Sequence, residues 1–347
     1  MVRLMNIVSR VNPFYSIVTL SIPLLISMFF GISSRRAIKT FLAWLTLIFL
    51  FLAIFINVYG FRVGGNFSSQ LFSFSIFHVV GISIVLFSAL NILLFLYILH
   101  REDEHFIKIL ILFLLSVCLC ILVLISRNFL MVFVSLAVFL VLVFQLVASL
   151  NIVDIVDNSR DNRKVAGVKD TKDREKSGQM YDNRYIIRLF LNPFLAVILF
   201  FFSFSMIYSS TDFKNFTQIV EADLVLLPFI LGGVAILAIG VYVYLFLIPF
   251  QGSYLKFMRR CESSSFSIMY FLYPLAGIFM LTKLNEVIYY IAERYRSIAG
   301  YIFVFLCFIC FVSSNLGALK SKSLRRFCCC LLLAFFYLIM QCFLLDL

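Results

Sequence analysis

Charge is scarce in this chain, and its position is restricted. Only 13% of the 347 residues are charged, against about 25% in ordinary soluble domains. None of the 29 Lys and Arg and 17 Asp and Glu lies near the middle of a long apolar run, and sixteen lie within residues 151–188. Such a chain cannot cover a soluble fold with polar side chains. The composition therefore excludes a soluble enzyme or binding domain.

The motifs of soluble catalysis are also missing. The sequence has no phosphate-binding glycine loop, dinucleotide fingerprint, His-rich metal pattern or nucleophile elbow. Most of the nine cysteines lie in apolar segments, and Cys307 and Cys310 lack a second pair at metal-ligand spacing. His78, within an apolar segment, is interpreted as a hydrogen-bonded packing residue or a proton relay. We expect no catalytic residue, no metal site and no cofactor bound by this chain itself.

Hydrophobic residues make up 63% of the sequence, and Phe alone occurs 43 times. A helix needs about 20 apolar residues to cross a bilayer, and ten segments meet this requirement. The predicted fold class is therefore an all-α polytopic membrane protein with about ten transmembrane helices. The segments are residues 14–32, 41–59, 72–99, 106–126, 129–150, 189–209, 224–249, 265–282, 298–316 and 327–345.

Three prolines lie inside these predicted spans, at Pro23, Pro228 and Pro274. Proline removes a backbone donor and clashes with the preceding turn, so it kinks or breaks a helix. Glycine weakens a helix through its conformational freedom. We therefore expect the segment 224–249 to be broken near Pro228 or Gly240.

Lys and Arg are unequally shared between the two predicted sides of the membrane. The side richer in Lys and Arg should be cytoplasmic, which puts both termini on the outer face, with a bacterial inner membrane as the expected location. We expect no removable signal peptide, since no small-residue cleavage site follows the first apolar run. The net charge of +12 reflects these loops, and no basic face suited to nucleic acid is present. The richer side carries Arg35, Arg36, Lys39, Arg101, Lys108, the loop 151–188, Lys256, Arg259, Arg260, Lys320, Lys322, Arg325 and Arg326; the other carries Arg3, Arg10, Arg62, Arg127, Lys214, Lys283, Arg294 and Arg296.

Two segments outside the predicted spans have distinct patterns. Residues 151–188 carry nine basic and seven acidic side chains, which predicts a flexible cytoplasmic loop or a docking tail for a soluble partner. Residues 283–297 have apolar side chains at helical spacing, which predicts an amphipathic helix lying in the membrane interface. The apolar positions are Leu284, Val287, Ile288 and Ile291.

Four segments follow one another in an order that resembles a known family. They are residues 104–136, residues 185–216, residues 240–254 with the turn Ile-Pro-Phe-Gln-Gly-Ser-Tyr, and residues 314–327. Together they resemble NADH-quinone oxidoreductase subunit N, an antiporter-like subunit in the membrane arm of respiratory complex I. The resemblance covers about residues 66 to 343. It implies a divergent and shortened member, with ten predicted helices where the family usually has fourteen.

The resemblance implies an architecture and a set of partners. It implies an N-terminal segment (1–105), an antiporter-like five-helix unit (106–282) and a final part (283–347) that contains the start of a second repeat. The complex would transfer electrons from NADH to quinone, with both bound by other subunits. The implied partners are other membrane-arm subunits and membrane lipid.

The family's proton path passes through buried Glu and Lys side chains, and this sequence departs from it at each matching position. Ala137 replaces a glutamate, Tyr244 and Leu275 replace lysines, and Gln251 replaces the histidine of the Pro-Phe-His turn. Alanine and leucine carry no charge, and tyrosine in water titrates only near pH 10. The resemblance therefore implies a structural membrane-arm subunit that does not pump by itself.

Two other functions stay open. A subunit of a multisubunit cation/proton antiporter would need the same missing charges. An unrelated polytopic carrier of a lipidic substrate would be compatible with the small number of polar groups inside the predicted spans.

Overall fold

A computed structural model gives the structure of most of the chain. The described residues are 15–30, 36–64, 67–68, 73–74, 76–100, 103, 105–165, 190–208, 227–246, 251–261, 263–291, 308–309, 311–312, 314–319, 327, 330 and 331. They divide into two compact units, each interleaved along the sequence. The units are defined by packing alone, and the five-helix unit expected over 106–282 stays a prediction.

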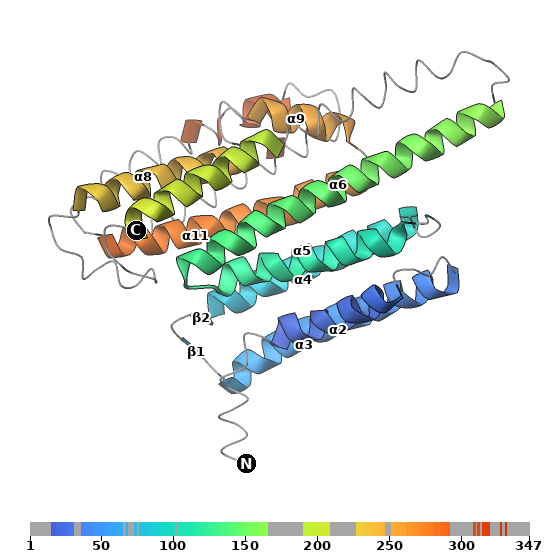
Figure 1. Cartoon of the computed structure of the whole chain (residues 1–347), viewed down its shortest axis with the longest axis horizontal. Coiled ribbons are helices and arrows are strands. Elements are labelled where there is room, and N and C mark those ends of the chain that lie inside the picture. Colours follow the sequence, from blue (N-terminus) through green and yellow to red (C-terminus); the bar gives the residue numbers. More distant parts are fainter. Residues whose placement is uncertain are drawn as a thin grey trace. The chain divides into compact units, whose positions relative to one another are not determined.

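The first unit contains five long helices and a small hairpin (Figure 1). α2 packs on α3 and α5, and α4 packs on α3 and α5. Large apolar side chains such as Leu86, Phe113 and Leu114 are fully buried in it. The elements are α2 (Tyr15–Phe29), α3 (Arg36–Gly64), β1 (Phe67–Ser68), β2 (Ser73–Phe74), α4 (Ile76–His100), α5 (Phe106–Ile125) and α6 (Phe129–Val165), of which α6 belongs to this unit from Val134 onward. β1 and β2 pair antiparallel between α3 and α4.

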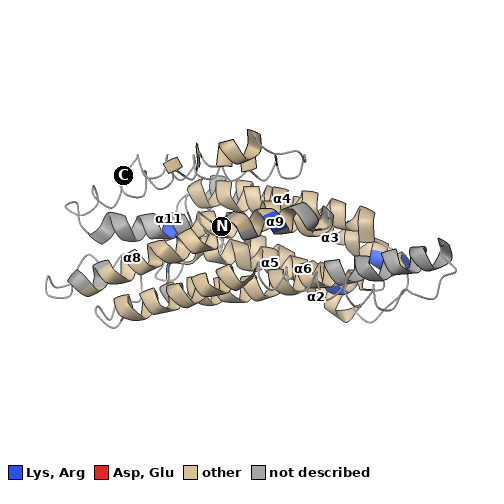
Figure 2. Cartoon of the chain, turned by 90° about the horizontal axis from the view of Figure 1, so that it is seen from above, with Lys and Arg blue, Asp and Glu red and all other residues tan. Residues whose placement is uncertain are grey.

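Five described helices are long and apolar enough to cross a membrane, and three shorter ones are similarly apolar. Eight of the ten predicted spans coincide with these helices, which confirms the fold class of an all-α polytopic membrane protein. Figure 2 shows these helices almost free of Lys and Arg. The long helices are Arg36–Tyr59, Phe77–His100, Phe106–Ile125, Leu130–Leu150 and Phe190–Tyr208, and the shorter ones are Tyr15–Phe29, Gly232–Tyr244 and Ser264–Met280. The two last predicted spans, 298–316 and 327–345, lie mostly outside the described residues.

α6 continues well beyond its apolar part. It runs from Phe129 to Val165 without interruption, so the prediction of a loop beginning at residue 151 is wrong for its first fifteen residues. These residues contain neither proline nor glycine, and opposite charges recur three positions apart at Asp157 and Arg160. Such spacing supports a solvated helix. The remainder of the predicted loop, 166–188, lies outside the described residues.

The second unit is built around a glycine-lined contact between two helices. It includes the helix Phe190–Tyr208, α8 (Leu227–Tyr244), α9 (Gln251–Arg260) and α11 (Tyr273–Ile291) from Pro274 onward. A Cβ atom at Gly233 would lie 2.7 Å from the Ile207 side chain, and one at Gly240 would lie 2.7 Å from the Phe200 ring. The Ser203 hydroxyl donates a hydrogen bond of 2.6 Å to the Gly233 carbonyl. Small residues thus let the two backbones approach closely.

The predicted break near Pro228 or Gly240 is wrong. α8 starts at Leu227, passes through Gly240 and ends at Tyr244. Pro228 is the second residue of the helix, where its missing N–H has no helical partner to lose. Gly240 is needed for the contact with Phe200 and leaves the backbone helical. The interruption comes later, between Tyr244 and the start of α9 at Gln251.

Two prolines lie inside helices without ending them. α2 continues through Pro23. Before Pro274, the helix α10 (Ser263–Ser267) passes into a π-helical turn, η4 (Ile268–Leu272), and then into α11. The wider turn accommodates a residue whose ring would clash with a regular helical carbonyl.

α11 continues to Ile291, so no separate interfacial helix begins at residue 283. That prediction is wrong for residues 283–291, while 292–297 lie outside the described residues. The apolar side chains at helical spacing belong to the continuation of one long helix.

Candidate functional site

The candidate site is the end of α8, where the resemblance places a lysine and this chain has Tyr244. Tyr244 is the last residue of α8 and is fully buried. Two residues later Phe246 adopts a left-handed backbone, with φ of 53°, which costs a residue with a side chain about 1–2 kcal/mol. The Phe246 ring stacks on Tyr254 of α9 at 5.1 Å between centroids. This contact favours the sharp change of direction between α8 and α9.

Aromatic and glycine residues surround the Tyr244 ring. The ring lies 6.5 Å from the Phe200 ring, tilted by 35°. On α11, a Cβ atom at Gly277 would lie 3.0 Å from two Tyr244 ring atoms and 2.3 Å from Leu245. Only glycine at 277 lets α11 pass this close. The ring is therefore held in tightly packed surroundings.

The four predicted site positions do not all meet at this point. Leu275 is half-buried on α11, two residues before Gly277, so helical geometry directs the two toward nearly opposite sides of the helix. Gln251 is the first residue of α9, and its side chain lies outside what the structure describes. Ala137 is half-buried in the part of α6 that belongs to the first unit. Among these positions, the described contacts place only Tyr244 in the packed cluster.

Lys283 is the residue that the sequence analysis misplaced. It was expected in an outer loop, but it lies inside α11 with 1% of its surface exposed. The preceding residues Ala276, Phe279 and Met280 of the same helix are also buried. A buried ionisable group in a membrane protein is a default candidate for function. The apolar spacing that continues beyond residue 283 was the signal that could have placed Lys283 within a helix.

A second buried amine lies in the first unit. Lys39, near the start of α3, is 3% exposed, and its Nζ donates a hydrogen bond of 2.6 Å to the Asp103 carbonyl oxygen. The Asp103 carboxylate pairs with Nδ1 of His100, also at 2.6 Å. These contacts hold the start of α3 to the connection between α4 and α5. The cluster is therefore explained as a polar clamp at the end of two spans.

The remaining titratable candidates have ordinary packing environments. His78 is buried beside Phe77, with the rings edge-on at 6.0 Å. Cys118, Cys120, Cys261 and Cys330 are free thiols. Within the described residues, no group of three or more His, Cys, Asp or Glu could hold a metal ion.

Solved structures share this fold. A chain of respiratory complex I from Thermus thermophilus matches 94% of this chain with a TM-score of 0.68 and 14% identity, over 63% of its own length. A chain of the membrane-bound sulfane sulfur reductase, an archaeal respiratory membrane complex, matches 94% of this chain with a TM-score of 0.67 and 16% identity, over 64% of its length. A chain of the Mrp complex from Dietzia sp. DQ12-45-1b matches 96% with a TM-score of 0.72 and 13% identity, over 59% of its length.

The chain spans about three fifths of the length of these structural neighbours. No protein-family model and no curated protein matches the sequence. The chain is thus a multi-pass membrane protein with the fold of chains from respiratory and related membrane complexes.

Proposed function

We propose that this chain is a membrane-arm subunit of a respiratory NADH:quinone oxidoreductase, with a mainly structural role. The observation that carries the proposal is that nearly the whole chain, 94%, superposes on one chain of respiratory complex I. The order of segments that resembles subunit N supports the same assignment. NADH and quinone would bind other subunits, because the described residues offer no site for either.

An exposed apolar stripe supports partners within the membrane. Along α3, large side chains at Phe41, Trp44, Ile48, Phe51 and Phe55 are each more than half exposed, at helical spacing. A continuous apolar face of this kind is stable only against lipid or other apolar helices. Neighbouring subunits and lipid would together cover it.

The structural role follows from the side chains at the candidate site. Proton transfer through a membrane requires groups that gain and lose charge during the cycle. Tyr244 is packed between Phe200 and Gly277, in surroundings without a described carboxylate or amine next to the ring. Leu275 and Ala137 cannot titrate. We therefore propose that the subunit preserves the fold without coupling proton movement at these positions.

Purification of the tagged chain from its native membrane in a mild detergent tests membership in the complex. We expect it to migrate with other polytopic subunits on a native gel, in a particle that oxidises NADH with a quinone analogue. A chain that migrates alone would contradict the assignment. A particle that contains other membrane subunits but does not oxidise NADH would replace it with a related complex.

Reconstitution of the isolated chain into vesicles with a pH-sensitive dye tests the structural role. We expect no saturable, cation-coupled proton movement. Coupled movement that Tyr244→Phe abolishes would overturn the structural role, because the two side chains differ only in the hydroxyl. The exposed Tyr208 provides a matched control, since Tyr208→Phe removes a hydroxyl outside the packed cluster.

A further inference from the structure

A small pocket lies between α3 and α4, near the ends of these helices that carry Lys39 and His100. It encloses about 250 Å³ and is partly open to the outside. Trp44 is 55% exposed and Leu94 is 38% exposed, so the opening faces the surroundings of the helices. The pocket is lined by Ala43, Trp44, Leu47, Leu93, Leu94 and Tyr97.

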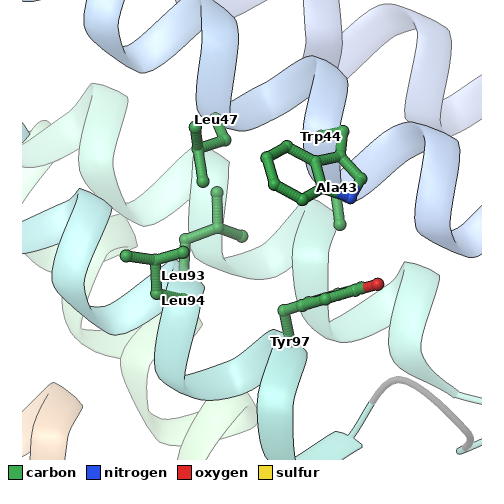
Figure 3. Close-up of a pocket in the computed structure, with 6 residues that line it drawn as sticks. All are labelled: Ala43, Trp44, Leu47, Leu93, Leu94 and Tyr97. Atoms are coloured by element: carbon green, nitrogen blue, oxygen red, sulfur yellow. The ribbon is translucent and has the colours of Figure 1, made fainter.

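The polar and apolar atoms of the pocket are separated. Figure 3 shows the indole nitrogen of Trp44 and the hydroxyl of Tyr97 toward one side, and the three leucines toward the other. Tryptophan and tyrosine with this orientation are typical of the membrane interface, where one end of the ring is apolar and the other is wet. The pocket thus has a polar end and a hydrocarbon end, like a lipid.

Basic side chains lie beyond the polar end. Arg36 is exposed at the start of α3, eight residues before Trp44, a rise of about 12 Å along the helix axis. Lys39 lies between them and bonds to the Asp103 carbonyl, while the Asp103 carboxylate is paired with His100. In the sequence, residues 35–39 and 100–108 carry five Lys or Arg against three Asp or Glu. The polar end therefore favours a negatively charged group.

We infer that this pocket binds an anionic phospholipid of the bilayer, with an acyl chain against the leucines and the phosphate toward Arg36. The Trp44 nitrogen and the Tyr97 hydroxyl would donate hydrogen bonds to the ester region between them. A neutral phospholipid would fill the apolar part but would gain nothing from Arg36. One basic residue near a membrane surface favours an anionic lipid by about fivefold.

Trp44 is the only tryptophan of the chain, so its fluorescence reports directly on the pocket. The full chain is placed in phosphatidylcholine nanodiscs, with either brominated phosphatidylglycerol or brominated phosphatidylcholine as the quencher. We expect the anionic lipid to quench Trp44 at about one fifth of the mole fraction that the neutral lipid needs. Arg36→Gln should bring the two quenching curves together.

Lys256→Gln is the matched control, because it removes an equally exposed positive charge in α9, and it should preserve the difference between the two lipids. Identical curves for the wild-type chain would overturn the inference. Absence of quenching by either lipid would also overturn it, since protein would then close the pocket. Survival of the preference in Arg36→Gln would show that Arg36 does not recognise the phosphate.

Discussion

Gly240 gives a direct test of the close contact in the second unit. In Gly240→Ala, the added Cβ atom would lie 2.7 Å from two atoms of the Phe200 ring and 3.4 Å from Leu199. The Phe200 ring is 2% exposed and packs against Tyr244, so it has little room to turn. The helices must therefore separate, or the ring must move against a neighbour that is itself fully buried.

Two opposing effects set the magnitude. Alanine is a better helix former than glycine by about 1 kcal/mol. Overpacking a tight core costs about 1–3 kcal/mol, and a rigid ring at this distance places the change at the upper end. We expect Gly240→Ala to lower the free energy of unfolding by about 2 kcal/mol, although the substitution favours the helix locally.

Thermal unfolding in detergent, followed with a thiol-reactive dye, measures the effect. Cys261 and Cys330 are buried thiols of the second unit and become reactive when it unfolds. At about 2 °C per kcal/mol, we expect a Tm about 4 °C lower. Gly252→Ala is the control, because an added Cβ there meets no atom within 4 Å, and its Tm should be unchanged or higher. If Gly240→Ala were as stable as the control, the close approach of the two helices would be refuted.

Four other substitutions test separate features. Ser203→Ala removes the hydrogen bond to α8 and should lower the free energy of unfolding by about 1 kcal/mol, measured in the same assay against the wild-type chain. Lys39→Met keeps the apolar stem but leaves the Asp103 carbonyl without its donor, and should lower the free energy of unfolding by about 1–3 kcal/mol; an unchanged Tm would contradict the clamp. A cysteine replacing Gly167 should react with an impermeant reagent only from the cytoplasmic side, and labelling from outside would reverse the predicted topology. Lys283→Met removes a buried charge, and if the subunit is structural, the assembled complex should keep its proton movement per NADH oxidised; a loss with the complex intact would assign Lys283 a role in coupling.

The positions of the spans could be predicted from the sequence because the bilayer imposes a length and a composition. Eight predicted spans coincide with described apolar helices. The ends were less predictable, as α6 and α11 show. Hydropathy reports where hydrocarbon ends, whereas a helix continues as long as its backbone is satisfied and no proline or glycine interrupts it. Residues 151–165 and 283–291 are therefore helical although they are polar.

The candidate site could be predicted only at the level of single positions. Tyr244 was singled out by its place in the resemblance, but its neighbours Phe200 and Gly277 were not. They lie 44 residues before it and 33 residues after it, and no local pattern reports contacts between helices that distant. Lys283 was missed for a related reason. At the end of an apolar run a lysine resembles one that extends to the membrane surface, and only its packing in the folded helix shows that it is buried.

The fold and the proton path rest on different residues, which explains how one could persist without the other. The contacts that hold the second unit are glycine-to-side-chain approaches at Gly233, Gly240 and Gly277, together with the Ser203 hydrogen bond. None of them involves a charged group. Replacing a buried Glu or Lys by a well-packed apolar residue is often neutral or stabilising, so the loss of such charges leaves these contacts intact. A chain can thus superpose on its structural neighbours at 13–16% identity whether or not it moves protons, and the role of this subunit has to be decided at its few charged residues.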